Sequence, residues 1–234
     1  MTITKTEILH TIQKRGYWIV MIRPTTFEKE RLRTVEDCLE IVQRGQVSLR
    51  GWNYPHYHES GVSAGGISIG TDYVQCITDH KHYKEIWRMY QSGQFFHRFA
   101  CVEDWWQRTE SQNVLEILST LYSITEIYLF ASRLALSDIW DTKMSITIEL
   151  WGMFNRKLIT LDPRRDLNNM YESMTDPLKY KKEYSKSEIV ADSASHALEC
   201  AVWLFRRFNW RSSELRDILR KDQSKFLNGE IPIY

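Results

Sequence analysis

Between residues 44 and 97, short β-strand signals alternate with turn signals, and this run limits the fold more than any other part of the sequence. Four segments in it are typical of strands: 67–69, 73–77, 85–90 and 94–100. Gly70-Thr71-Asp72 separates the first two and Ser92-Gly93 the last two, which predicts two β-hairpins. Connections this short join antiparallel strands, because parallel strands need a crossover of about a dozen residues or more. The run therefore predicts an antiparallel sheet.

The alternation within the second hairpin also predicts which side chains share a face of the sheet. In its first strand one face carries Trp87 and Met89, and the other carries Ile86, Arg88 and Tyr90. In its second strand one face carries Phe95, His97 and Phe99, and the other carries Phe96 and Arg98.

Helices are predicted on both sides of this run. Three capping boxes mark their starts: Thr4 with Glu7, Thr34 with Asp37, and Ser185 with Glu188. Residues 114–136 form the most apolar helix of the chain, with large side chains recurring at helical spacing and no glycine or proline. A helix of this kind is buried on most sides. A last short helix is expected at about residues 213–226.

Three further strands and one polar stretch complete the predicted order of elements along the chain. Residues 17–23 are nearly all apolar and end before Pro24, which predicts a strand covered on both faces. Residues 144–151 alternate as a strand, and 156–161 are expected to pair with it across a turn at Gly152. Residues 162–186 are polar and are predicted to be a loop or linker.

Together these elements predict an α+β fold. An antiparallel sheet from the N-terminal half packs against the 114–136 helix and the C-terminal helices. Residues 1–161 would form the core domain, 162–186 the linker, and 187–234 a set of helices packed on the same core.

Composition excludes several classes of protein. The chain has 234 residues, 43% of them hydrophobic and 26% charged, which indicates a globular protein with a sizeable core. A formal net charge of +1 provides no overall field for nucleic acid or membrane binding. The four cysteines are far apart in sequence, which predicts buried, reduced thiols and a cytoplasmic location. No membrane span is expected either, because charged residues interrupt the 114–136 helix.

One of those charged residues, Glu126, lies among Ile124, Ile127 and Leu129 on the most apolar helix. A buried carboxylate needs a partner or a raised pKa. We therefore predict that Glu126 is not a free surface charge. Arg133, seven residues later, or a Lys or Tyr from the sheet would be its partner.

A histidine-rich segment is the candidate metal site. His56 and His58 project to the same side of an extended chain, and Glu59 follows as a further ligand or general base. His80 and His82 repeat the spacing. The alternative is that all of them are solvated loop histidines, since no third ligand has a fixed spacing.

Arg50, Trp52 and Tyr54 form the first candidate ligand site. Gly51 is expected to permit a bend or a positive φ between Arg50 and Trp52. With alternate residues on one side, the two rings would form an aromatic shelf beside a cation, suited to stacking a base and pairing a phosphate. In the alternative interpretation both rings fill the core.

Arg206, Arg207 and Arg211 form the second candidate ligand site, beside Trp203 and Trp210 at the end of the C-terminal helix. They could contact phosphates next to aromatic stacking partners. The alternative is that they only complement the helix dipole, which favours cations at a helix C-terminus.

Three strings carry a resemblance: Trp18-Ile19-Val20 leading to Ile22-Arg23-Pro24, then Leu49-Arg50-Gly51-Trp52-Asn53-Tyr54-Pro55, and Tyr90-Gln91-Ser92-Gly93-Gln94-Phe95. Over about the first hundred residues the chain resembles an uncharacterised bacterial domain. That domain is similar to ones found beside Schlafen-like, AlbA-type modules predicted to bind nucleic acid. The resemblance implies a bacterial accessory or sensing module in a defence or regulatory setting, and it implies no catalytic residues.

Two functions remain open from the sequence. The first is a non-enzymatic module that binds a ligand, a nucleotide, a nucleic acid or a protein partner, and a homo-oligomer is a further expected state. The second is a metal-dependent hydrolase or nuclease that uses His56, His58 and Glu59. The cofactor remains unknown from the sequence, since the chain has neither a phosphate-binding loop nor a dinucleotide fingerprint to identify one.

Overall fold

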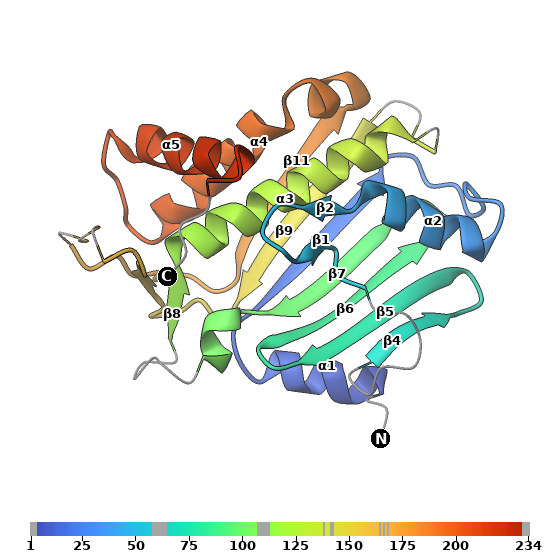
Figure 1. Ribbon diagram of the computed structural model, residues 1–234, viewed down its shortest axis with the longest axis horizontal. Helices are drawn as coiled ribbons and strands as arrows, with labels where there is room; N and C mark the ends of the chain where they lie inside the picture. Colours follow the sequence, from blue (N-terminus) through green and yellow to red (C-terminus); the bar gives the residue numbers. More distant parts are fainter. Residues whose placement is uncertain are drawn as a thin grey trace.

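The computed structural model describes residues 4–57, 65–106, 113–137, 139–140, 143–163, 165, 167 and 169–230. Within them a seven-stranded antiparallel sheet has the order β11-β9-β1-β7-β6-β5-β4 (Figure 1). Its strands are β1 (Tyr17–Pro24), β4 (Gly65–Ile69), β5 (Tyr73–His80), β6 (Tyr83–Tyr90), β7 (Phe95–Ala100), β9 (Lys143–Trp151) and β11 (Leu178–Ser185). The predicted α+β class and both predicted hairpins are confirmed.

Strand β1 lies inside the sheet, between β7 and β9. Its β-branched and aromatic residues suit a pleated strand with neighbours on both sides. Trp18, Val20 and Ile22 face the main core, and Tyr17 packs against a smaller cluster on the opposite face. This position explains why the strand is nearly all apolar.

Helices cover both faces of the sheet. In Figure 1, α3 (Ile117–Leu136) runs along one face, with α2 (Val35–Gly45) on one side of it and α4 (Lys186–Arg207) and α5 (Leu215–Leu227) on the other. Helix α1 (Lys5–Gln13) packs on the opposite face, where Ile8 and Ile12 contact the cluster of Ile77 and Ile86. The capping boxes at Thr4, Thr34 and Ser185 are all formed.

Short elements complete the order: β2 (Val47–Ser48), β3 (Asn53–Tyr54), the 3₁₀ helix η1 (Val102–Trp105), β8 (Val114–Glu116) and β10 (Lys157–Ile159). Two of them correct the sequence predictions. Residues 114–116 form a strand that pairs with β10, and the helix begins only at Ile117, where the Glu116 side chain accepts a hydrogen bond from the Ser119 amide. Strand β10 pairs in parallel with β8 and not with β9, whose two edges are taken by β1 and β11.

The polar stretch 162–186 is not a loop throughout, since its end forms the edge strand β11. Leu178 and Tyr184 of this strand are buried, and Lys179, Lys181 and Glu183 are exposed. The alternation is therefore present, but lysines and a glutamate supply its polar half. That composition is typical of an edge strand.

One main core joins the sheet to the C-terminal helices. Trp87 of β6, Phe130 of α3, Phe205 of α4 and Phe226 of α5 are fully buried in a single cluster. All four cysteines are buried and free, as predicted. Across the described part of the chain, no helix is long and apolar enough to cross a membrane.

Candidate functional site

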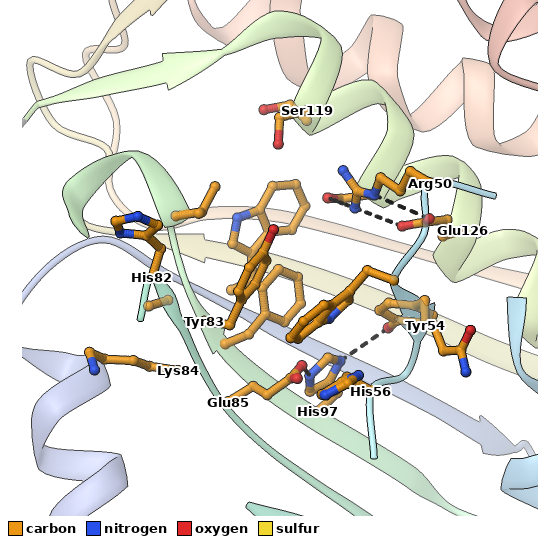
Figure 2. Close-up of a pocket in the computed structure, with 18 of the residues that line it drawn as sticks. Arg50, Tyr54, His56, His82, Tyr83, Lys84, Glu85, His97, Ser119 and Glu126 are labelled. Atoms are coloured by element: carbon orange, nitrogen blue, oxygen red, sulfur yellow. Dashed lines mark hydrogen bonds and ion pairs between the residues drawn. The ribbon is translucent and has the colours of Figure 1, made fainter. Parts of the chain in front are cut away.

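A cavity of about 140 Å³ lies between the sheet and α3 (Figure 2). Its lining combines aromatic side chains with buried acids and hydroxyls. The sheet contributes Trp18, Tyr83, Lys84, Glu85, His97, Phe99 and Ala100. Helix α3 contributes Ser119, Thr120, Ser123 and Glu126, and the segment around β2 and β3 contributes Arg50, Trp52, Asn53, Tyr54 and His56. The remaining lining residues are His82, Val102 and Glu103. Three other hollows among the described residues have fewer buried polar groups in their walls.

The β2–β3 segment folds over the cavity as a small antiparallel ribbon. Val47 pairs with Tyr54 and Ser48 with Asn53. The connection between them contains Gly51 with φ +71°, the positive φ that the sequence predicted. This turn directs Arg50 and Trp52 to the cavity while Tyr54 enters the core beneath them.

Arg50 and Glu126 form a two-point ion pair on one side of the cavity. Arg50 Nε donates to Glu126 Oε1 at 3.2 Å and Nη2 donates to Oε2 at 2.7 Å, while Nη2 also reaches Ser123 Oγ at 3.0 Å. Burial raises the pKa of Glu126, and the nearby guanidinium opposes that shift. The carboxylate side chain is only 1% exposed, so the prediction of a buried, partnered Glu126 is confirmed.

The partner suggested for Glu126 was wrong. Arg133 donates instead to the backbone carbonyl of Gln46. Arg50 is 76 residues from Glu126 in sequence, so no helical spacing could indicate this pair.

On the opposite side of the cavity, His97 links Tyr54 to Glu85 (Figure 2). His97 Nδ1 lies 3.3 Å from the Tyr54 hydroxyl, and Nε2 lies 2.8 Å from Glu85 Oε2. All three side chains are buried. Burial raises the pKa of Tyr54 well above its ordinary range, and the carboxylates of Glu85 and Glu126 raise it further. Tyr54 therefore stays protonated at neutral pH.

Two polar atoms in the cavity wall have no hydrogen-bond partner among the described residues: Glu85 Oε1 and Thr120 Oγ1. Buried polar atoms nearly always have a partner in folded proteins. An unpartnered carboxylate oxygen is the more costly of the two, because charged groups lose more solvation on burial. These atoms point to a bound group that supplies hydrogen bonds.

Glu103 adds a third buried carboxyl group to the lining. Its Oε1 accepts from the Glu116 amide at 3.0 Å. Burial, the largest influence, raises the pKa of Glu103 to about 7, against the lowering effect of its hydrogen bonds and of Arg156. At neutral pH this carboxyl group is therefore close to half protonated.

Trp52 is held between two other rings at the cavity rim. Its centroid lies 3.8 Å from that of His56 and 4.2 Å from that of Tyr83, with nearly parallel planes. Tyr54 instead lies in the core, in edge contact with Phe130. The structure thus brings Arg50, Trp52 and Tyr54 to one cavity, but it does not align the two rings as an open shelf.

We predict that Trp52→Ala lowers the free energy of unfolding by only about 1 kcal/mol, because Trp52 is only partly buried and a stacked ring pair contributes about 0.5–1.5 kcal/mol beyond its area. Urea unfolding measures the change, with Phe27→Ala as the control, since Phe27 is an exposed aromatic outside the cavity. A loss above about 3 kcal/mol, the cost typical of a core tryptophan, would contradict the rim position.

The candidate metal ligands are only partly described. His56 and His82 line the cavity, and His80 is exposed on β5. His58 and Glu59 lie outside the described residues. Within the described ranges no three His, Cys, Asp or Glu side chains are grouped in a way that could hold a metal ion.

Arg206, Arg207 and Arg211 lie in a different place. They line an open hollow on the C-terminal helices together with Trp203 and Arg216. Trp210 does not join them, because it is buried against Tyr171 and Phe205.

Sequence reasoning missed Glu85, Glu103 and the α3 hydroxyls as parts of one site. One signal was available for Glu85 and His97. Both occupy core-facing positions of one hairpin, where apolar residues are expected. Two polar residues at such positions indicate that their side chains interact with each other.

No protein-family model, curated protein or solved structure matches this chain at a significant level.

Proposed function

We propose that this protein is a non-enzymatic binding or sensing module whose cavity holds one small planar ring carrying N–H donors. The unpartnered Glu85 Oε1 is the observation that carries the proposal. A ligand N–H directed at this oxygen would restore the hydrogen bond that the protein itself does not supply.

The size and walls of the cavity support a single ring. Cavities near 150 Å³ with apolar walls accommodate molecules of about the size of benzene. Here the volume is about 140 Å³, and Trp18, Phe99 and Trp52 supply aromatic surface. Aromatic walls favour a flat ligand, because offset stacking and edge contacts add to the burial of its surface.

The charges in the cavity support a neutral or cationic ligand. The lining holds two cations, and both are already paired: Arg50 with Glu126 and Lys84 with Asp79. Glu85 and Glu103 add negative character. An anion entering here would have to displace a buried carboxylate from its guanidinium, which is costly. An aminopyridine or aminopyrimidine ring matches both the acids and the aromatic walls.

The same contacts support binding in preference to catalysis. Both ring nitrogens of His97 are engaged by Tyr54 and Glu85, and Tyr54 stays protonated. These contacts fix the position of the His97 ring, and Tyr54 keeps its proton at neutral pH. The arrangement instead holds Glu85 in one orientation, which favours selective recognition.

We predict that 2-aminopyridine binds with measurable affinity and that Glu85→Gln weakens this binding about tenfold or more, since it removes a charge-assisted hydrogen bond. Isothermal titration calorimetry gives both affinities. Glu183→Gln is the matched control, because it makes the same change at an exposed site on β11 and should bind as the wild type does.

Toluene has a ring of similar size without donors and serves as the control ligand. It should bind more weakly than 2-aminopyridine. Equal binding of the two ligands, or a Glu85→Gln variant with wild-type affinity, would remove the support for this function.

A further inference from the structure

Four arginines line an open hollow of about 640 Å³ on the C-terminal helices. Arg206 and Arg207 come from the last turn of α4, Arg211 from the connection after it, and Arg216 from the first turn of α5. Trp203 and Glu199 of α4 also line it. The hollow shares no residue with the cavity over the sheet.

The charges in this hollow are not balanced by the protein. Among the described residues, no carboxylate lies within ion-pair distance of any of the four guanidinium groups. The one acid in the lining, Glu199, accepts a hydrogen bond from Lys182 Nζ at 2.7 Å. That bond, and to a smaller extent the charges of His196 and Arg216, lower the pKa of Glu199. A net positive hollow of this kind attracts a ligand with several negative charges.

Helix stability does not account for the set. Cations in the last turn of a helix interact favourably with its dipole, which explains Arg206 and Arg207. Arg216 lies in the first turn of α5, where the same dipole disfavours a cation, and Arg211 lies in neither helix. Four arginines converge here although only two of them benefit their helices, so another contribution to their placement is needed.

Trp203 gives the hollow an aromatic surface beside its cations. Trp203, Arg206 and Arg207 are spaced three and four residues apart on α4, so they share one helical face. The indole ring is half-buried, with the Tyr180 ring 5.3 Å away in edge contact and the Arg207 guanidinium 5.0 Å from its centroid. Its orientation is therefore held by its neighbours.

We propose that this hollow binds single-stranded nucleic acid, with phosphates on the arginines and one base stacked on Trp203. A held aromatic ring next to a row of cations is the combination by which proteins bind single strands without reading a specific sequence. Duplexes fit this combination less well, because their bases are already stacked and offer no free ring. The proposal is independent of the ligand in the sheet cavity.

The test uses the full chain and a fluorescein-labelled 12-nucleotide oligo-dT, followed by fluorescence anisotropy. We expect binding whose log affinity falls with log salt with a slope of about −3, since each of about four neutralised phosphates contributes about −0.7. Arg207→Gln combined with Arg211→Gln should reduce the slope by about 1.4 and weaken binding about tenfold or more. The matched control is Arg44→Gln combined with Arg220→Gln, which removes two exposed helical arginines outside the hollow and should leave both quantities nearly unchanged.

Trp203→Leu distinguishes a nucleic-acid site from a general anion site. Leucine keeps apolar volume against Tyr180 but removes the stacking face, so oligo-dT binding should weaken about tenfold while inorganic polyphosphate binding stays the same. Circular dichroism establishes that the variant is folded. Absence of salt-dependent binding, a duplex bound as tightly as the single strand, or equal loss of oligo-dT and polyphosphate binding in Trp203→Leu would each overturn the proposal.

Discussion

Arg156→Leu is expected to lower the free energy of unfolding by about 4 kcal/mol, because it leaves the buried Asp104 carboxylate without its counter-charge. Arg156 and Asp104 form a two-point ion pair with distances of 2.9 and 2.8 Å, and neither side chain is more than 2% exposed. The same guanidinium donates to the carbonyls of Gly152 and Val114. One substitution therefore removes hydrogen bonds that join the turn after β9 to η1 and β8.

Urea unfolding at pH 7 measures this loss, with Arg44→Leu as the control. Arg44 forms an ion pair with Glu40 in which both side chains are more than half exposed, so its removal should cost less than about 1 kcal/mol. Combining Arg156→Leu with Asp104→Leu should recover part of the stability, since no unpaired charge then remains buried. An Arg156→Leu variant as stable as the Arg44→Leu control would show that the pair is not a major stabilising interaction.

Glu103→Gln is expected to remove a stability change of about 3 kcal/mol between pH 4 and pH 8. Burial raises the pKa of Glu103 from 4.5 to about 7, so the folded state binds a proton that the unfolded state has lost at pH 6. Stability from this group is fully present below the unfolded pKa and is lost as the pH rises through 7. Each unit of the shift corresponds to about 1.4 kcal/mol.

Free energies of unfolding across this pH range test the prediction. Glutamine keeps an oxygen that can accept from the Glu116 amide, so Glu103→Gln should retain the fold while losing this pH dependence. At pH 8 the variant should be more stable than the wild type. Glu183→Gln, an exposed change on β11, should keep the wild-type profile. An unaltered profile in Glu103→Gln would mean that the carboxyl group titrates at its ordinary pKa.

The sequence predicted local structure well where a few neighbouring residues decide it. The three capping boxes and the two hairpins depend on side chains within a few positions of one another, and each was predicted. The sequence also predicted which neighbours share a face of the strand with His97 and with Trp87. Side chains alternate between the two faces of a strand, so this prediction holds once the strand itself is predicted correctly.

The errors arose where distant segments decide the outcome. Residues 114–116 continue the apolar pattern of α3, and only their pairing with β10 shows that they form a strand. Strand β11 alternates, but its exposed positions carry charged residues, and the resulting polarity resembled that of a loop. The pairing of β10 required knowing that β9 already had two neighbours.

The candidate site was predicted only in part for the same reason. Arg50, Trp52, Tyr54 and His56 are close in sequence, and all four line the cavity. Glu126 was predicted to be buried from its own helix alone, whereas its ion pair with Arg50 exists only because the β2–β3 ribbon lies against α3. Cavities form between elements, so their volume has no signature in any single segment.

The charged side chains of the edge strand β11 have a consequence for the behaviour of the protein in concentrated solution. An open sheet exposes backbone hydrogen-bonding groups at its edge, which can recruit a strand from another molecule and begin a fibril. The side chains of Lys179 and Lys181 on this edge strand are exposed to solvent. A second copy docking there would bring its own lysines close to these, and this repulsion disfavours growth into an intermolecular β-sheet.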